Sequence, residues 1–225
     1  MRKKYISVIF LFAVMLMLIV HFGARITAQP TFSFAEEKKI YLTFDDGPST
    51  IVTGHILDTL KEENIKATFF IVSDRAESRK ETLRRIAAEG HTLGVHSKTH
   101  DYSSIYASKA ALKKDITACA ERIEAITGVT PRCYRFPGGE TKGHPWHALA
   151  EDMGYRVVSW NAVCGDEEIA GASPKTLYET SVKTVEGKNP VILLLHDSAP
   201  HKATAQALPE IIAHFRKLGY TFCAF

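Results

Sequence analysis

The stretch VILLLHDS, residues 191–198, contains five consecutive apolar residues followed directly by polar ones. An apolar run without alternation is typical of a strand that is buried on both faces, as in a parallel sheet covered by helices. His196 follows this run at once, so we expect its side chain to emerge where the strand ends. The stretch therefore predicts an α/β fold with a polar site at the carboxyl ends of the strands.

The rest of the chain alternates between strand-like and helix-like segments. Seven strands alternating with six helices indicate a parallel sheet with helical crossovers. An open doubly wound sheet and an incomplete α/β barrel both fit this pattern, because periodicity does not report closure. The predicted strands lie near residues 39–45, 67–72, 92–96, 132–136, 155–160, 190–196 and 220–225, and the predicted helices near 51–63, 76–89, 107–127, 144–153, 174–187 and 204–217.

The first 28 residues differ in composition from the rest. Basic residues at positions 2–4 precede an apolar run, residues 6–20, that only Ser7 interrupts. The run is near the upper length for a signal peptide and near the lower length for a membrane span. We interpret residues 1–28 as a signal peptide or N-terminal membrane anchor, 29–38 as a linker and 39–225 as the folded domain. The domain is expected outside the cytoplasm, secreted or anchored, with membrane contact only through an uncleaved leader.

The charge of the chain gives no indication of nucleic acid binding. The full sequence has a net charge of +3, but the first 28 residues hold four basic residues and no acidic ones. Without them, 24 basic residues face 25 acidic ones, a net charge of −1. No basic run remains in the rest of the chain, so a nucleic acid partner is not expected.

Four cysteines, an even number, are compatible with either of two states. In an oxidising compartment they could form disulfides, with three formal pairings. They could equally be buried free thiols, because a domain of this size does not need crosslinks. Their spacing matches no zinc-knuckle pattern; the residues are Cys119, Cys133, Cys164 and Cys223.

The motif TFDDGPST, residues 43–50, places Asp45 and Asp46 side by side between a predicted strand and a predicted helix. Asp-Gly is also an ordinary turn signal, so a surface turn with two acids is the alternative. Successive side chains of a strand point in opposite directions. Adjacent aspartates at its end can therefore divide two tasks, one binding a metal ion and the other facing a reacting water.

The motif HSKTH places His96 and His100 four residues apart after the third predicted strand. If the segment turns helically, both imidazoles lie on one face and can share a metal ion. An aspartate from the first strand would complete a set of two imidazoles and one carboxylate, with positions left for water and substrate. Two unrelated surface histidines are the alternative.

Two more strand ends carry candidate residues. Arg135 precedes Pro137 and Gly138, in a loop where backbone N–H groups could approach a ligand and the arginine could pair with a carboxylate. Asp166 could hold a proton of His196 and raise its pKa, which would make the histidine a general acid. The alternatives are a surface arginine beside a turn and a structural histidine. Taken together, five strand ends are predicted to deliver reactive residue types to one rim.

In chain order, TFDDGP, HSKTH, RFPGG and LLLHD resemble the motifs of the polysaccharide deacetylases of the NodB-homology class, carbohydrate esterase family 4. The resemblance runs from about Lys39 to Phe225. It implies an α/β fold, a distorted, incomplete (β/α) barrel with about seven parallel strands. The implied site has Asp45 as catalytic base, Asp46, His96 and His100 as metal ligands, Arg135 as the residue that orients the base, His196 as general acid oriented by Asp166, and Leu194, Gly138 and Pro137 at the substrate.

The resemblance also implies an activity: metal-dependent hydrolysis of the acetamide of N-acetylglucosamine units in peptidoglycan or a chitin-like glycan, with release of acetate. The implied cofactor is one divalent ion, zinc first, although cobalt, nickel and manganese fit the same ligands. An O-deacetylase of an acetylated polysaccharide such as xylan and a non-catalytic glycan-binding module are the alternatives.

The chain departs from the family pattern at two positions. Asp166 is followed by Glu167 where tryptophan is usual, and Gly138 stands where many members carry an aromatic residue. Both departures predict a smaller stacking wall for a sugar.

Overall fold

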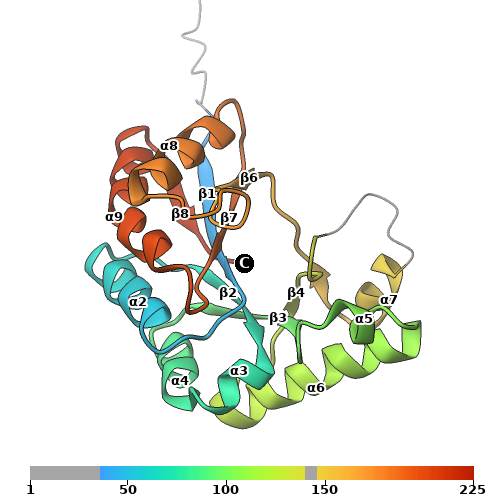
Figure 1. Ribbon diagram of the computed structural model, residues 1–225. Coiled ribbons are helices and arrows are strands. Elements are labelled where there is room, and N and C mark those ends of the chain that lie inside the picture. Colours follow the sequence, from blue (N-terminus) through green and yellow to red (C-terminus); the bar gives the residue numbers. More distant parts are fainter. Residues whose placement is uncertain (1–35, 140–145) are drawn as a thin grey trace, which may run out of the picture. The chain divides into compact units, whose positions relative to one another are not determined.

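A strongly curled, open sheet of parallel strands forms the centre of the fold (Figure 1). The strands follow the order β5-β4-β3-β2-β1-β7-β6, and β8 pairs with the first residues of β1. Strands β5 and β6 are the two ends of this path, so the half-barrel stays open between them, as the family resemblance implies. The strands are β1 (Lys39–Asp45), β2 (Thr68–Val72), β3 (Thr92–Ser97), β4 (Cys133–Tyr134), β5 (Arg156–Val157), β6 (Ala162–Val163), β7 (Val191–His196) and β8 (Thr221–Cys223).

The computed structural model describes residues 36–139 and 146–225. The predicted leader, residues 1–28, and most of the predicted linker lie outside the described residues. Residues Glu37–Phe225 form one compact unit. No helix in the described part of the chain is long and apolar enough to cross a membrane.

Helices cover the convex side of the sheet, with α2 beside α9 and α8 packed on α9 (Figure 1). Each of the six predicted helices has a counterpart among the described residues, although 144–145 of the helix predicted at 144–153 lie outside them. The segment predicted as one helix at 76–89 is divided into α3 and α4, and the short α5 was not predicted. The helices are α2 (Val52–Glu62), α3 (Ser73–Glu77), α4 (Lys80–Ala88), α5 (Tyr102–Ile105), α6 (Lys109–Thr127), α7 (His147–Asp152), α8 (Pro174–Val185) and α9 (Lys202–Lys217).

The strands are apolar on both faces because each face meets its own cluster. Val191, Leu193 and Leu195 of β7 belong to the large core under the helices. Ile192, pointing the other way, belongs to a smaller cluster with Phe70, Cys133, Val158 and the C-terminal Phe225. The uninterrupted apolar run at 191–195 therefore correctly predicted a strand buried on both faces.

The C-terminal residue fills part of the concave side. The ring of Phe225 stacks on that of Tyr41 with 4.5 Å between centroids, and its N–H donates to Thr68 Oγ1 at 3.2 Å. Figure 1 shows the C-terminus near the middle of the sheet. The C-terminal ring therefore occupies part of the space inside the half-barrel.

All four cysteines are free thiols, and three of them are buried. Cys119 donates its S–H to the carbonyl of Ile71 at 3.3 Å, and burial raises the pKa of this thiol to about 12. Of the two states compatible with the sequence, the structure therefore shows the free thiols.

Gly94 in β3 is a position where the packing excludes a side chain. A Cβ there would lie 2.5 Å from Cδ1 of Phe70. We expect Gly94→Ala to lower the free energy of unfolding by about 1–3 kcal/mol, because a ring in the closely packed interior must move. The measurement is urea unfolding followed by circular dichroism.

The control is Gly54→Ala in α2, where a Cβ would meet nothing within 4 Å. This substitution is expected to stabilise the protein by about 0.5–1 kcal/mol, since alanine is the better helix former. Equal stability of the Gly94→Ala variant and the unchanged chain would contradict the packing argument.

Candidate active site

The end of β1 presents two buried carboxylates. Asp45 is the last residue of the strand, and Asp46 adopts a left-handed backbone conformation with φ of 75°. The two residues are 3% and 8% exposed. Aspartate tolerates the left-handed region better than most residues do. The turn thus holds both buried carboxylates at the carboxyl end of the strand, 3.9 and 3.7 Å from His96 Nε2.

Asp46, His96 and His100 come together at the rim. Oδ1 of Asp46 lies 3.1 Å from Nε2 of His100 and 3.7 Å from Nε2 of His96. One ligand atom from each residue lies within 4.8 Å of the other two. The sequence placed these residues in one set, and the structure brings them together.

The three side chains fit a divalent cation. Oδ1 of Asp46 is buried and has no hydrogen-bond partner among the described residues. His96 Nδ1 bonds to the carbonyl of Arg135 at 2.8 Å, which directs Nε2 toward Asp46. Burial lowers the pKa of His96 and so favours the neutral imidazole that binds metals. An orphaned carboxylate oxygen between two imidazole nitrogens is the donor set that zinc and similar ions take.

His100 reaches this site by a turn and not by the helical turn considered from the sequence. Ser97 Oγ accepts from the N–H groups of Thr99 and His100, at 3.1 and 2.9 Å, and donates to Asp115 Oδ1 at 3.2 Å. His100 itself has φ of 65°. A serine-bonded turn therefore brings the second imidazole back toward the first.

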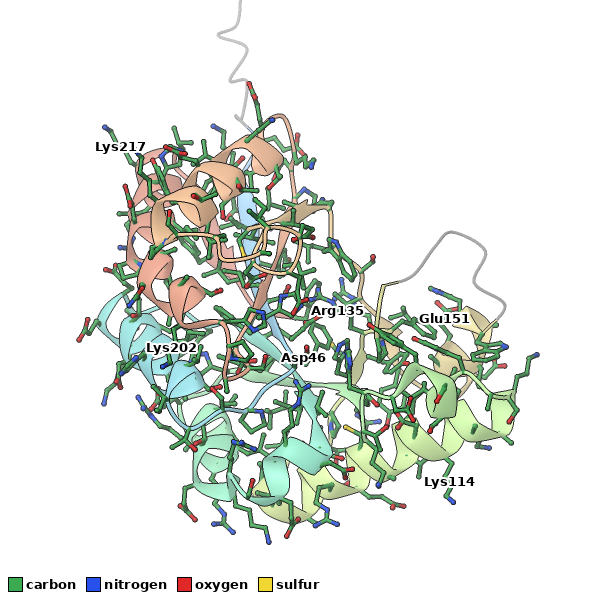
Figure 2. The ribbon with its side chains drawn as sticks, viewed as in Figure 1. Asp46, Lys114, Arg135, Glu151, Lys202 and Lys217 are labelled. Atoms are coloured by element: carbon green, nitrogen blue, oxygen red, sulfur yellow. The ribbon has the colours of Figure 1, made fainter. Side chains whose placement is uncertain are left out.

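Arg135 is fully buried and joins Asp45 to the open side of the half-barrel. Its Nη1 donates to Asp45 Oδ1 at 2.7 Å and to Thr43 Oγ1 at 2.8 Å. Nε and Nη2 donate to the carbonyls of Val158 and Ser159, both at 3.2 Å. Figure 2 shows Asp46 and Arg135 in the middle of the unit, with Lys114 and Lys217 at its periphery. One guanidinium thus connects β1 with the segment that leaves β5.

His196, the last residue of β7, is held by Asp166. Nδ1 of His196 lies 2.8 Å from Asp166 Oδ1, and its backbone N–H donates to Oδ2 at 2.8 Å. Thr204 Oγ1 also donates to Oδ2, at 2.7 Å. Burial opposes protonation of the imidazole, but the hydrogen bond and charge of Asp166 outweigh it, and with Asp45 and Asp46 they raise the pKa of His196 to about 9.

Residues 34–158 match the family model described as polysaccharide deacetylase. The chain belongs to the polysaccharide deacetylase family. It is therefore a hydrolase acting on carbon–nitrogen bonds. It is 31% identical over 187 residues to a peptidoglycan-N-acetylglucosamine deacetylase of Bacillus cereus, covering 83% of this chain and 85% of that one.

Two further comparisons agree with this family. YheN of Bacillus subtilis is 31% identical over 191 residues, covering 83% of this chain, which spans 66% of YheN. The catalytic domain of the Eubacterium rectale peptidoglycan N-acetylglucosamine deacetylase superposes with a TM-score of 0.75 at 31% identity, covering 85% of this chain and 90% of that one. The half-barrel is thus the fold of this family.

Asp45, His196 and the three candidate metal ligands line one cavity of about 220 Å³. Arg135 and Asp166 are not in its lining, but they are bonded to Asp45 and His196, which line it. Gly138 and Leu194 border it as predicted, whereas Pro137 is not in the lining and instead accepts a hydrogen bond from Tyr106 Oη through its carbonyl. A larger cavity of about 540 Å³ between α8 and α9 shares no residue with it. The lining consists of Asp45, Asp46, His96, His100, Tyr102, Phe136, Gly138, Trp160, Glu167, Glu168, Leu194 and His196.

Aromatic walls are present where the deacetylase motifs predicted less stacking surface. Tyr102 and Trp160 both line the cavity. A Cβ at Gly138 would lie 3.1 Å from the Tyr102 ring, and one at Gly139 2.5 Å from the Trp160 ring. The two glycines thus leave room for rings contributed by other segments. These aromatic walls were not predicted, although Trp160 stands at the end of the strand predicted at 155–160.

Asp197 supports the loop after β1 and was given no role from the sequence. Its N–H donates to the carbonyl of Asp45 at 3.1 Å, and its Oδ2 accepts from Thr53 Oγ1 at 2.6 Å. A Cβ at Gly47 would lie 2.1 Å from Oδ2. Burial raises the pKa of Asp197 to about 7. Its position directly after His196, at the end of β7, was the feature of the sequence that could have indicated a place near the site.

Proposed function

We propose that this protein is an extracytoplasmic, metal-dependent N-deacetylase that hydrolyses the acetamide of N-acetylglucosamine units in peptidoglycan or a chitin-like glycan and releases acetate. The observation that carries the proposal is the orphaned Oδ1 of Asp46 between two imidazoles, in the same cavity as Asp45 and His196. The similarity to peptidoglycan deacetylases supports the glycan. Because peptidoglycan lies outside the cell membrane, this substrate also supports the location and the interpretation of residues 1–28 as a leader.

Asp46, His96 and His100 would hold one divalent ion, zinc first, with cobalt, nickel or manganese compatible with the same donors. When bound, such an ion polarises a carbonyl and lowers the pKa of water. Neither effect positions the substrate. That task falls to the protein side chains around the ion.

Asp45 is the base in this proposal. Its Oδ1 is held by Arg135 Nη1, which leaves Oδ2 to accept a proton from the attacking water. As the carbon–nitrogen bond breaks, His196 delivers the proton on Nε2 to the departing nitrogen, because Nδ1 faces Asp166. Leu194 borders the acetyl methyl group, and a backbone N–H near Gly138 stabilises the oxyanion. The products are acetate and a free amine on the sugar.

Product analysis on defined substrates tests this proposal. The full-length chain is incubated with N-acetylglucosamine oligomers, peptidoglycan and acetylated xylan, and both acetate and free amine are measured. We expect acetate and amine in equal amounts from the first two. Acetate from xylan alone would favour the O-deacetylase, and no acetate from any substrate would favour the glycan-binding module.

Metal removal is expected to lower acetate release by on the order of 100-fold or more, and added zinc or cobalt should restore it. Asp46→Ala should lower the bound metal and the rate together. Asp74→Ala is the control, because Asp74 is exposed and pairs with Lys98. Full activity in the chelated protein would contradict the metal assignment.

Asp166→Asn is expected to change the pH dependence of the rate. The pKa of His196 is about 9, so its acid form persists below that pH and the rate should fall as pH rises through about 9. An asparagine lacks the charge that holds the proton, so the alkaline fall should move toward pH 6.5, the ordinary value for histidine. The measurement is the pH profile of kcat.

The control for this prediction is Glu168→Gln, which changes another acid that lines the same cavity. It should leave the pH of the alkaline fall unchanged. An unchanged profile in Asp166→Asn would contradict the assignment of His196 as an acid whose proton is held by Asp166.

A further inference from the structure

Glu167, His196 and His201 form a second group of metal-ligating side chains, separate from the set of Asp46, His96 and His100. One ligand atom from each of the three lies within 4.8 Å of the other two. Two imidazole nitrogens and one carboxylate oxygen are the same donors that the first set offers. Such a set suits zinc and related divalent ions.

Both histidines are oriented as metal ligands are. His196 Nδ1 is bonded to Asp166 Oδ1 at 2.8 Å, and His201 Nδ1 lies 2.9 Å from Ser198 Oγ. Metal-binding histidines commonly have their other ring nitrogen held in this way. The Nε2 atoms of both rings therefore remain as ligand atoms.

The two rings and the carboxylate already lie side by side. The rings of His196 and His201 stack with 5.1 Å between centroids and 30° between planes. His201 Nε2 lies 3.1 Å from Glu167 Oε1, and the His201 side chain is only 10% exposed. The catalytic scheme above gives His201 no task, so its burial beside the general acid calls for another explanation.

The position of Glu167 gives an ion a route to this group. Glu167 lines the reaction cavity and also an adjoining cavity of about 350 Å³, which His201 borders as well. The second cavity therefore gives an ion a path to Glu167 and His201, although Asp46 also borders it. His196 lines the neighbouring reaction cavity, which Glu167 borders as well.

We propose that Glu167, His196 and His201 bind a second divalent ion, and that this ion inhibits the enzyme by occupying Nε2 of His196. The inhibition rests on the proposed function, in which that nitrogen carries the proton for the leaving amine. The proton and the ion compete for the same lone pair. Binding at this site is therefore weaker than at Asp46, His96 and His100.

Counting bound ions tests the site without any assay of activity. The metal-free full-length chain is titrated with Zn²⁺ at neutral pH by equilibrium dialysis. We expect two ions, the second bound more weakly. His201→Gln and Glu167→Gln should each weaken the second ion by about tenfold or more and leave the first unchanged, and Asp46→Ala should lose the first ion and keep the second.

Two control variants accompany these. Glu168→Gln removes a neighbouring acid in the same cavity, and His55→Gln removes an exposed histidine on α2. Both should still bind two ions. A single bound ion in the unchanged chain, or an undiminished second ion in both His201→Gln and Glu167→Gln, would overturn the second site.

Inhibition is read as the rate in excess Zn²⁺ divided by the rate with one equivalent. We expect a ratio of about 0.1 or less for the unchanged chain and a ratio near one for His201→Gln. Only the unchanged chain binds the second ion, which takes the place of the proton on His196. Two bound ions with an unchanged ratio would overturn the inhibition. If no substrate yields acetate at all, the proposed function fails, while the ion count still decides the second site.

Discussion

Replacing Asp45 with asparagine is expected to lower the rate of acetate release by about a thousandfold. The amide cannot take a proton from water, so the base is lost. It can still accept the hydrogen bond that Arg135 Nη1 gives to Oδ1 at 2.7 Å, so the local structure should remain. The measurement is kcat on an N-acetylglucosamine oligomer, with bound metal quantified in the same sample.

The metal content separates a base from a structural acid. Oδ2 of Asp45 lies 3.9 Å from His96 Nε2, so a role in positioning that imidazole is the competing explanation. A structural role predicts that metal is lost along with activity. Asp58→Asn, an exposed carboxylate on α2, is the matched control and should leave both quantities unchanged. A rate within about tenfold of the unchanged chain, at full metal content, would exclude Asp45 as the base.

Much of the sheet could be predicted from the sequence because its strands carry local signals. β1, β2 and β7 carry enough apolar, β-branched and aromatic residues to be recognised as strands, and the residues after them fall at one rim. The strands β4 and β5 are only two residues long. Backbone hydrogen bonds continue the pairing beyond them: the N–H of Arg135 donates to the carbonyl of Val95, and the N–H of Val158 donates to the carbonyl of Tyr134. β6 was not predicted, because two residues, Ala162 and Val163, are too short a stretch to show the hydrophobic pattern of a strand.

The polar residues of the site were predicted, as were Gly138 and Leu194 in its wall, but the aromatic walls were missed. The polar residues sit in short motifs at strand ends, and parallel strands bring their carboxyl ends to one edge. Tyr102 and Trp160 reach the cavity from α5 and from the segment after β5. No local pattern records that two glycines at 138 and 139 make room for these rings, because that is a contact between distant segments.

Arg135→Met is expected to lower the free energy of unfolding by about 3–5 kcal/mol, the largest stability change among these substitutions. The substitution leaves Asp45 as an unpaired carboxylate whose side chain is only 4% exposed. It also removes the donors to the carbonyls of Val158 and Ser159 on the open side of the half-barrel. The measurement is urea unfolding of the metal-free protein, so that metal binding does not add to the apparent stability.

A double-mutant cycle separates the ion pair from the other bonds of Arg135. In Arg135→Met with Asp45→Asn, no buried charge lacks its partner, so the double variant should be more stable than the sum of the single losses predicts, by about 0.5–3 kcal/mol. Arg122→Met removes an exposed ion pair with Glu77 and should cost no more than about 1 kcal/mol. If the two single losses simply add, Arg135 stabilises the fold through the carbonyls of the open side and not through Asp45. The guanidinium would then act as the closure of the half-barrel, and orientation of the base would follow from that closure.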